Sequence, residues 1–291
     1  METSVHTGND YFVTRNQLRK ENIPFSESHI RRFAPSVFAE KPADDVTERY
    51  RFYPTYKVLE RMQKEGWSVY DAHQARSRSG NNLVTRHVLR FRHPDLSLCK
   101  KVGDQFPEIV LVNSHDKKCA FSVQFGIFRL VCSNGLIIAD QNIGNIKLRH
   151  SHVLDQVLET VDYLIEQAPA VGTKIEAMQI LDLDEYDRET YAREALRIKH
   201  HGILPVNSIE PNQLLKTRRE KDNKKDLWTT YNVLQENITQ GGIHYRKMTP
   251  TGKIRHASIR GIKNVLDDLR INKALWNQAE TILEHKAGVL V

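Results

Sequence analysis

The stretch LVTRHVLRFRH, residues 83–93, decides the fold that we expect for this chain. Basic and apolar residues alternate along it: Arg86, Arg90 and Arg92 occupy even positions, whereas Leu89 and Phe91 occupy odd ones. A period of two is that of a β-strand, whose successive side chains point to opposite faces. The pattern therefore predicts a strand with three arginines on one face and apolar residues on the other.

Segments on both sides of this stretch extend it into a meander. SVYDAHQARSRSG, residues 68–80, leads into a turn at 79–82 and predicts a hairpin with 83–93. EIVLVNSHD (108–116) and CAFSVQFGIFRLVCSNGLIIA (119–139) read as further strands, with a bulge expected at Gly126. Asn134 and Gly135 suit a tight turn, so FRLVCSNGLIIA reads as strand, reverse turn and return strand.

Helical periodicity precedes and follows the strands. In residues 49–67 Thr55 is expected to cap a helix that places Val58, Leu59 and Met62 on one face and ends at Gly66. Further helices are predicted within 152–168, 174–202, 226–242 and 272–288. TRREKDNKKD (217–226) reads as a solvated charge run, and 243–261 as a basic β-hairpin that turns at 249–252.

This order of elements indicates an α+β fold: an antiparallel β-meander with a basic face, covered by helices. A C-terminal helical region then carries the basic hairpin. We expect three parts, an N-terminal arm at 1–48, an α+β core domain at 49–205 and the helical region at 206–291.

Composition narrows the classes of protein. The 291 residues have a formal net charge of +7, which is typical of many nucleic-acid-binding proteins. The sequence shows no apolar run long enough for a membrane span and no secretory signal, so no membrane partner is expected. Three widely spaced cysteines fit a reducing compartment, and we expect a cytoplasmic protein.

No catalytic constellation is strong enough to name a reaction, and an enzyme is not the expected class. Cys132, between Val131 and Ser133 on an apolar strand, reads as a buried structural thiol rather than a nucleophile. His150 and His152 lack the spacing of a metal site, and no phosphate-binding glycine loop is visible. We therefore expect no metal and no cofactor.

The basic residues gather near the predicted strands and the later hairpin. Arginine is the preferred phosphate partner because its planar group donates two parallel hydrogen bonds. Tyr70 and Tyr245 are near enough in sequence to stack on bases. The alternative is that these cations solvate a sheet face or pair with acids. The predicted nucleic-acid-binding residues are Arg76, Arg78, Arg86, Arg90, Arg92, Lys147, Arg149, Arg246, Lys247, Lys253, Arg255, Arg260 and Lys263.

The stretches 108–139, 49–67 and 86–96 together resemble the plasmid- and phage-borne domain-of-unknown-function family 932, over roughly residues 49–285. The resemblance implies a bacterial mobile element and no particular reaction. The order of a helix ending in Gly66 and Trp67, a β-meander with a basic face and a long helix is also similar to the Rad52-like single-strand annealing proteins. That second likeness rests on architecture alone and implies a cofactor-free ring that holds DNA in a basic groove.

Two functions are therefore expected. The first is a non-enzymatic protein of a phage or plasmid that binds and anneals single-stranded DNA as a homo-oligomer. The second is a mobile-element protein that binds and inhibits a host defence complex or another host protein. A third function, that of an enzyme acting on nucleic acid through His115 or Asp116, is the least favoured hypothesis.

Overall fold

The computed structural model describes residues 13–47, 50, 52–77, 81–94, 105–129, 134–137, 146–147, 153–201, 209–248, 251–262 and 264–288. It confirms the α+β class. The backbone forms two compact units: unit 1 consists of 1–136 with 142–168, and unit 2 of 137–141 with 169–291. The division of the chain into domains at 48 and 205 stays a prediction.

Unit 1 contains the predicted antiparallel meander. The strands β1 (Ser68–Gln74), β2 (His87–Arg92), β3 (Gln105–Asn113), β4 (Ser122–Arg129) and β5 (Asn134–Ile137) lie in sequence order, and β6 (Ile146–Lys147) also pairs with β4. The bulge expected at Gly126 is wrong, because β3 and β4 keep one register from Gln105 to Val112. A register shift occurs instead in β1, between Val69 and Asp71.

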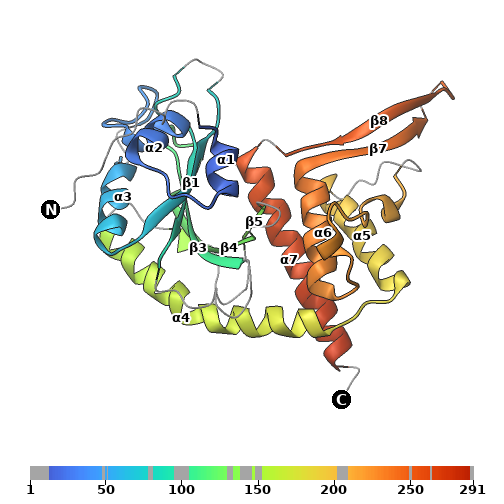
Figure 1. Cartoon of the computed structure of the whole chain (residues 1–291). Helices are drawn as coiled ribbons and strands as arrows, with labels where there is room; N and C mark the ends of the chain where they lie inside the picture. Colours follow the sequence, from blue (N-terminus) through green and yellow to red (C-terminus); the bar gives the residue numbers. More distant parts are fainter. Residues whose placement is uncertain are drawn as a thin grey trace. The chain divides into compact units, whose positions relative to one another are not determined.

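The N-terminal segment packs against this sheet. It forms α1 (Arg15–Lys20), α2 (Glu27–Phe33) and the 3₁₀ helix η1 (Pro35–Phe38), and α1 and α2 both contact β1. The side chains of Leu18, Phe25, Ile30 and Val37 are buried. Figure 1 shows these blue helices beside β1. Because its apolar side chains lie in the core, this segment is part of the fold of unit 1.

The helix α3 (Thr55–Lys64) matches the predicted face, since Val58, Leu59 and Met62 are all buried. Gly66 follows it with φ +88°, the left-handed conformation expected of a glycine after a helix. The predicted capping role of Thr55 is wrong. Its hydroxyl accepts a hydrogen bond from Asn113 Nδ2 at 2.9 Å and lies 2.8 Å from His87 Nε2. Thr55 therefore bonds to buried polar side chains instead of to the end of the helix.

Helices dominate unit 2. The long helix α4 (Val153–Ile180) begins in unit 1 and ends in unit 2, where α5 (Glu185–Lys199), α6 (Leu227–Gln240) and α7 (Val265–Gly288) pack together. Two 3₁₀ helices, η3 (Pro211–Gln213) and η4 (Glu220–Asp222), lie between α5 and α6. Every residue of α6 from Leu227 to Ile238 is buried, and Trp228 stacks on Tyr231 with ring centroids 5.5 Å apart. The helix α6 is therefore the centre of this unit.

The predicted basic hairpin is present. The strands β7 (Gly241–Met248) and β8 (Ile254–Arg260) form a separate two-stranded antiparallel sheet. Figure 1 shows this orange ribbon extending beyond the helices α5, α6 and α7 of its own unit. None of the helices in the described part of the chain is long and apolar enough to cross a membrane.

Candidate nucleic-acid interface

The expected basic face of the meander is not an open phosphate-binding surface. Arg90 and Arg92 do share one face of β2, as their spacing predicts, but their side chains are only 5% and 7% exposed. Both pair with Glu108 of β3, whose side chain is 0% exposed. Arg90 Nη1 donates to one carboxylate oxygen at 2.9 Å, and Arg92 Nε donates to the other at 2.8 Å. The expectation that these two arginines meet a polyanion is therefore wrong.

The helix α1 covers this buried cluster of charged side chains. Arg15 donates two hydrogen bonds of 2.6 Å to the carboxylate of Asp71, and Arg19 lies 3.4 Å from the same group. Burial alone would raise the pKa of Asp71, but Arg15 and Arg19 overcome this effect and hold it well below its usual range. Arg92 also donates to Asn22, just after α1. The cluster binds the N-terminal helix to the sheet and has a structural role.

Of the remaining predicted positions of unit 1, none that the structure describes has a contact with this cluster among the bonds and ion pairs given above. Arg76 is exposed, whereas Arg86 is half-buried and donates to the carbonyl of Lys118 at 3.4 Å. Lys147 lies opposite Ser122 in the register of β6 and β4. Arg78 and Arg149 lie outside the described residues, as does Cys132. Tyr70 lies against Arg92, whose guanidinium is 4.3 Å from the ring centroid, so it is not positioned for a base.

His115, which would be catalytic if the protein were an enzyme acting on nucleic acid, lies in a buried polar network. His115 is fully buried, and its Nε2 lies 3.4 Å from the hydroxyl of Thr55. His87 Nδ1 donates to the carbonyl of Thr85 at 3.0 Å, so its Nε2 accepts from Thr55. Burial lowers the pKa of His87 to about 3 and that of His115 to about 4, which keeps both rings neutral. Neutral, enclosed rings of this kind stabilise the core. Among the described residues no group of three or more His, Cys, Asp or Glu side chains could hold a metal ion.

The β7–β8 hairpin is a basic surface that is accessible in the described part of the chain. Its register pairs Arg246 with His256, Tyr245 with Ala257 and Lys247 with Arg255. Partners in an antiparallel register share a face, so basic positions occur on both faces of the ribbon. The residues from 251 to 256 are all exposed, as are Arg246 and Arg260. An isolated two-stranded ribbon buries too little to be stable alone, so its base must be held by the rest of the unit.

Contacts at its base fix the hairpin to α6. Lys199 Nζ of α5 donates to the carbonyls of Ile238 and Arg260 at 3.1 and 3.0 Å. Arg218 donates to the carbonyl of Gly241 at 2.6 Å and to Asn237 Oδ1 at 2.9 Å. The sequence did not predict either anchor, because Lys199 and Arg218 bind groups that are distant from them in the sequence.

The charge run 217–226 is solvated only in part: residues 218, 220, 221 and 223–225 are exposed, as predicted, but other side chains of the run pack on the unit. Arg219 donates to Glu236 of α6 and, at 3.0 Å, to the buried carboxylate of Asp222. These bonds and those of Arg218 tie the segment to the central helix. The charges of this run serve packing as well as solubility.

The hairpin carries charge of a single sign. Residues 241–266 contain six Lys or Arg residues and no Asp or Glu. Within the part of the chain that the structure describes, no carboxylate forms an ion pair with Arg246, Arg255 or Arg260. Lys263 lies outside the described residues. The exposed arginines of this projecting ribbon raise the local positive potential, which attracts polyanions.

Comparison with known proteins places the chain in a family. Two proteins of Escherichia coli K12, UPF0380 protein YafZ and UPF0380 protein YfjQ, are each 34% identical to it over 275 residues, which is 94% of this chain and 96% of theirs. No solved structure matches. The likeness to Rad52-like annealing proteins thus stays an expectation. The family model described as "Domain of unknown function (DUF932)" matches residues 42–276, and the chain therefore belongs to the DUF932 family.

Proposed function

We propose that the protein binds single-stranded DNA through the β7–β8 hairpin, and that this binding requires no nucleotide. One observation carries the proposal: an anchored, projecting ribbon displays exposed arginines on a stretch that contains no acidic residue. The role that the sequence suggested for the meander face is not part of it, because Arg90 and Arg92 are buried and paired with Glu108.

The chemistry of the ribbon favours a single strand. Guanidinium groups contact phosphates and leave base edges free, so a strand held in this way can still pair with its complement. Tyr245 lies beside the cations on β7 and offers a ring on which a base can stack. Annealing of complementary strands is the activity that such binding would support. A homo-oligomer would lengthen the bound segment, and its existence stays a prediction.

Fluorescence anisotropy with a labelled oligonucleotide tests the proposal. The variant Arg246→Ala/Arg255→Ala/Arg260→Ala should bind the single strand at least several-fold more weakly, because three phosphate contacts are lost. A matched control removes three exposed cations of unit 1, through Lys20→Ala/Lys57→Ala/Lys64→Ala, with the same change in net charge. Equal losses in both variants would show that only net charge matters and would refute a role for the hairpin.

A comparison of substrates separates the alternatives. Tighter binding of a duplex than of a single strand would refute the proposed substrate, because a β-ribbon can also enter a major groove. If instead the hairpin captures a host protein, a pull-down from lysate treated with nuclease should retain that partner. Its loss in the hairpin variant, together with no oligonucleotide binding by the parent, would favour inhibition of a host protein.

A further inference from the structure

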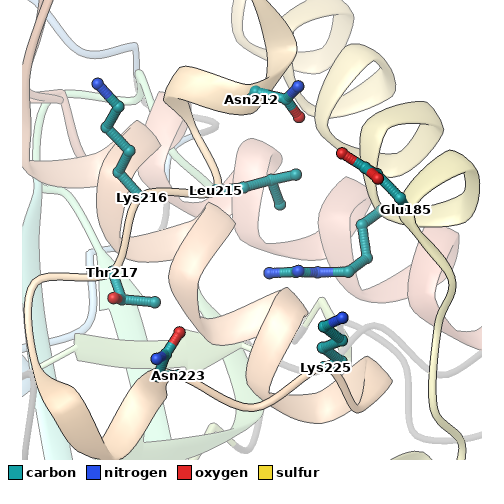
Figure 2. Close-up of a pocket in the computed structure, with 8 residues that line it drawn as sticks. Glu185, Asn212, Leu215, Lys216, Thr217, Asn223 and Lys225 are labelled. Carbon is teal, nitrogen blue, oxygen red and sulfur yellow. The ribbon is translucent and has the colours of Figure 1, made fainter.

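A pocket in unit 2 has the composition of an anion site. It has a volume of about 610 Å³ and lies between the first turn of α5 and the segment 212–225. That size is within the range of small-molecule sites. Figure 2 shows Glu185 on the helix and Leu215 on the segment pointing toward one another across the space. The residues that line it are Glu185, Arg188, Asn212, Leu215, Lys216, Thr217, Asn223 and Lys225.

The charges of the pocket are unbalanced. Three cations, Arg188, Lys216 and Lys225, line it together with one carboxylate, that of Glu185. Within the described residues none of these three cations forms an ion pair with an acidic side chain. The Nε atom of Arg188 is enclosed and has no hydrogen-bond partner there. An excess of unpaired cations in the lining favours an anionic ligand, with which guanidinium and ammonium groups form charge-assisted hydrogen bonds.

The uncharged lining residues narrow the ligand class. Thr217 and Asn223 offer a hydroxyl and an amide, and Leu215 offers an apolar surface. Asn212 donates to Glu189 at 2.6 Å, which fixes that edge of the pocket. Phosphate groups of a ligand would match the cations, and its hydroxyl groups would match the single carboxylate. A flat apolar ring would match Leu215.

We propose that this pocket binds a small nucleoside phosphate, held through its phosphate groups by Arg188 and Lys225. The carboxylate of Glu185 would accept hydrogen bonds from the sugar hydroxyls. The site shares no cation with the β7–β8 hairpin, so substitutions can test the two sites separately. No chemical step is part of the proposal.

Isothermal titration calorimetry of the full chain with ADP, pyrophosphate and adenosine tests the site. ADP and pyrophosphate should bind, and adenosine should bind at least tenfold more weakly. The variants Arg188→Gln and Lys225→Gln should each weaken ADP binding by about tenfold or more, because each removes a charge-assisted contact. Lys224→Gln is the matched control: it removes an exposed neighbouring cation that does not line the pocket, and affinity should be unchanged.

Several results would overturn the proposal. They are equal affinity for adenosine and ADP, no binding of ADP or pyrophosphate, and equal effects of Lys225→Gln and Lys224→Gln. A 5′-phosphorylated oligonucleotide that binds this pocket better than ADP would identify a strand end as the source of the phosphate and would refute the free nucleotide. The hairpin variant should keep its affinity for ADP, and the pocket variants their affinity for DNA. A failure of one site is thus distinguishable from a failure of the other.

Discussion

The substitution Glu108→Gln tests whether the arginines of β2 are structural. Glu108 is fully buried and takes hydrogen bonds of 2.9 and 2.8 Å from Arg90 and Arg92. Its neutralisation leaves two buried guanidinium groups without their shared counter-charge. Removing one partner of a buried ion pair costs about 3–5 kcal/mol. Unit 1 should therefore lose about that much free energy of unfolding, a large part of what a typical domain has.

Urea denaturation and hydrogen exchange would measure the effect. Because two compact units can unfold separately, exchange of the β2 and β3 amides should be followed, since it reports on unit 1 alone. A loss of 3–5 kcal/mol corresponds to roughly two to three and a half orders of magnitude in exchange rate. The control Glu60→Gln, on the exposed side of α3, should change the free energy of unfolding by less than about 0.5 kcal/mol.

Two outcomes would refute this reasoning. One is a Glu108→Gln protein with unchanged stability, which would show that the buried charges are not coupled. The other is a substituted protein that stays folded and binds single-stranded DNA more tightly than the parent. That result would return Arg90 and Arg92 to the interface.

Two further predictions concern pH and the base of the hairpin. Because folding lowers the pKa of His87 to about 3 and that of His115 to about 4, the unfolded chain binds more protons between those values and about 6.5, the usual pKa of histidine. The free energy of unfolding should be highest above pH 6.5 and fall as pH decreases, by about 1.4 kcal/mol for each ring at pH 5.5. Urea titrations across pH should show this slope; equal stability at pH 7.5 and 5.5 would contradict it. At the base of the hairpin, Gly241→Ala should destabilise unit 2 more than Gly242→Ala, as measured by thermal unfolding. Both glycines have positive φ, but a Cβ on Gly241 would lie 2.5 Å from the backbone of Ile259, whereas one on Gly242 would meet nothing within 4 Å. Equal losses would contradict the close approach.

Local patterns predicted much of the fold. The strand around Leu89, the apolar face of α3 and the pairing of β7 with β8 depend on neighbouring residues, and the structure confirms all three. The α+β class follows from their order. Gly126 shows the limit of such patterns, since a glycine in a strand permits a bulge without requiring one.

The errors have a common physical cause. Period two placed Arg90 and Arg92 on one face correctly, but it could not show that Glu108 and α1 would enclose that face. The role of Thr55 was missed in the same way, because its partners His87 and Asn113 lie 32 and 58 residues away. Long-range pairing decides whether a charged side chain is a surface or a core residue.

Neither the anchors of the hairpin nor the pocket of unit 2 could be predicted from the sequence. Arg218 stood in a charge run typical of solvent, yet it donates to a backbone carbonyl of β7. The pocket combines α5 with a segment about 30 residues further along, so no local spacing signals it. By contrast, the basic hairpin could be predicted, since its cations and its turn lie within one continuous stretch.

The salt dependence of single-stranded DNA binding tests the central claim most directly. If the five basic positions between Arg246 and Arg260 each neutralise one phosphate, log Kd should rise with log salt with a slope of about 3.5, and with about 1.4 in the variant that lacks Arg246, Arg255 and Arg260. Between 50 and 200 mM salt the unchanged protein should then lose about a hundredfold in affinity. The same slope in both proteins, or a slope near zero in the parent, would contradict binding through the β7–β8 hairpin.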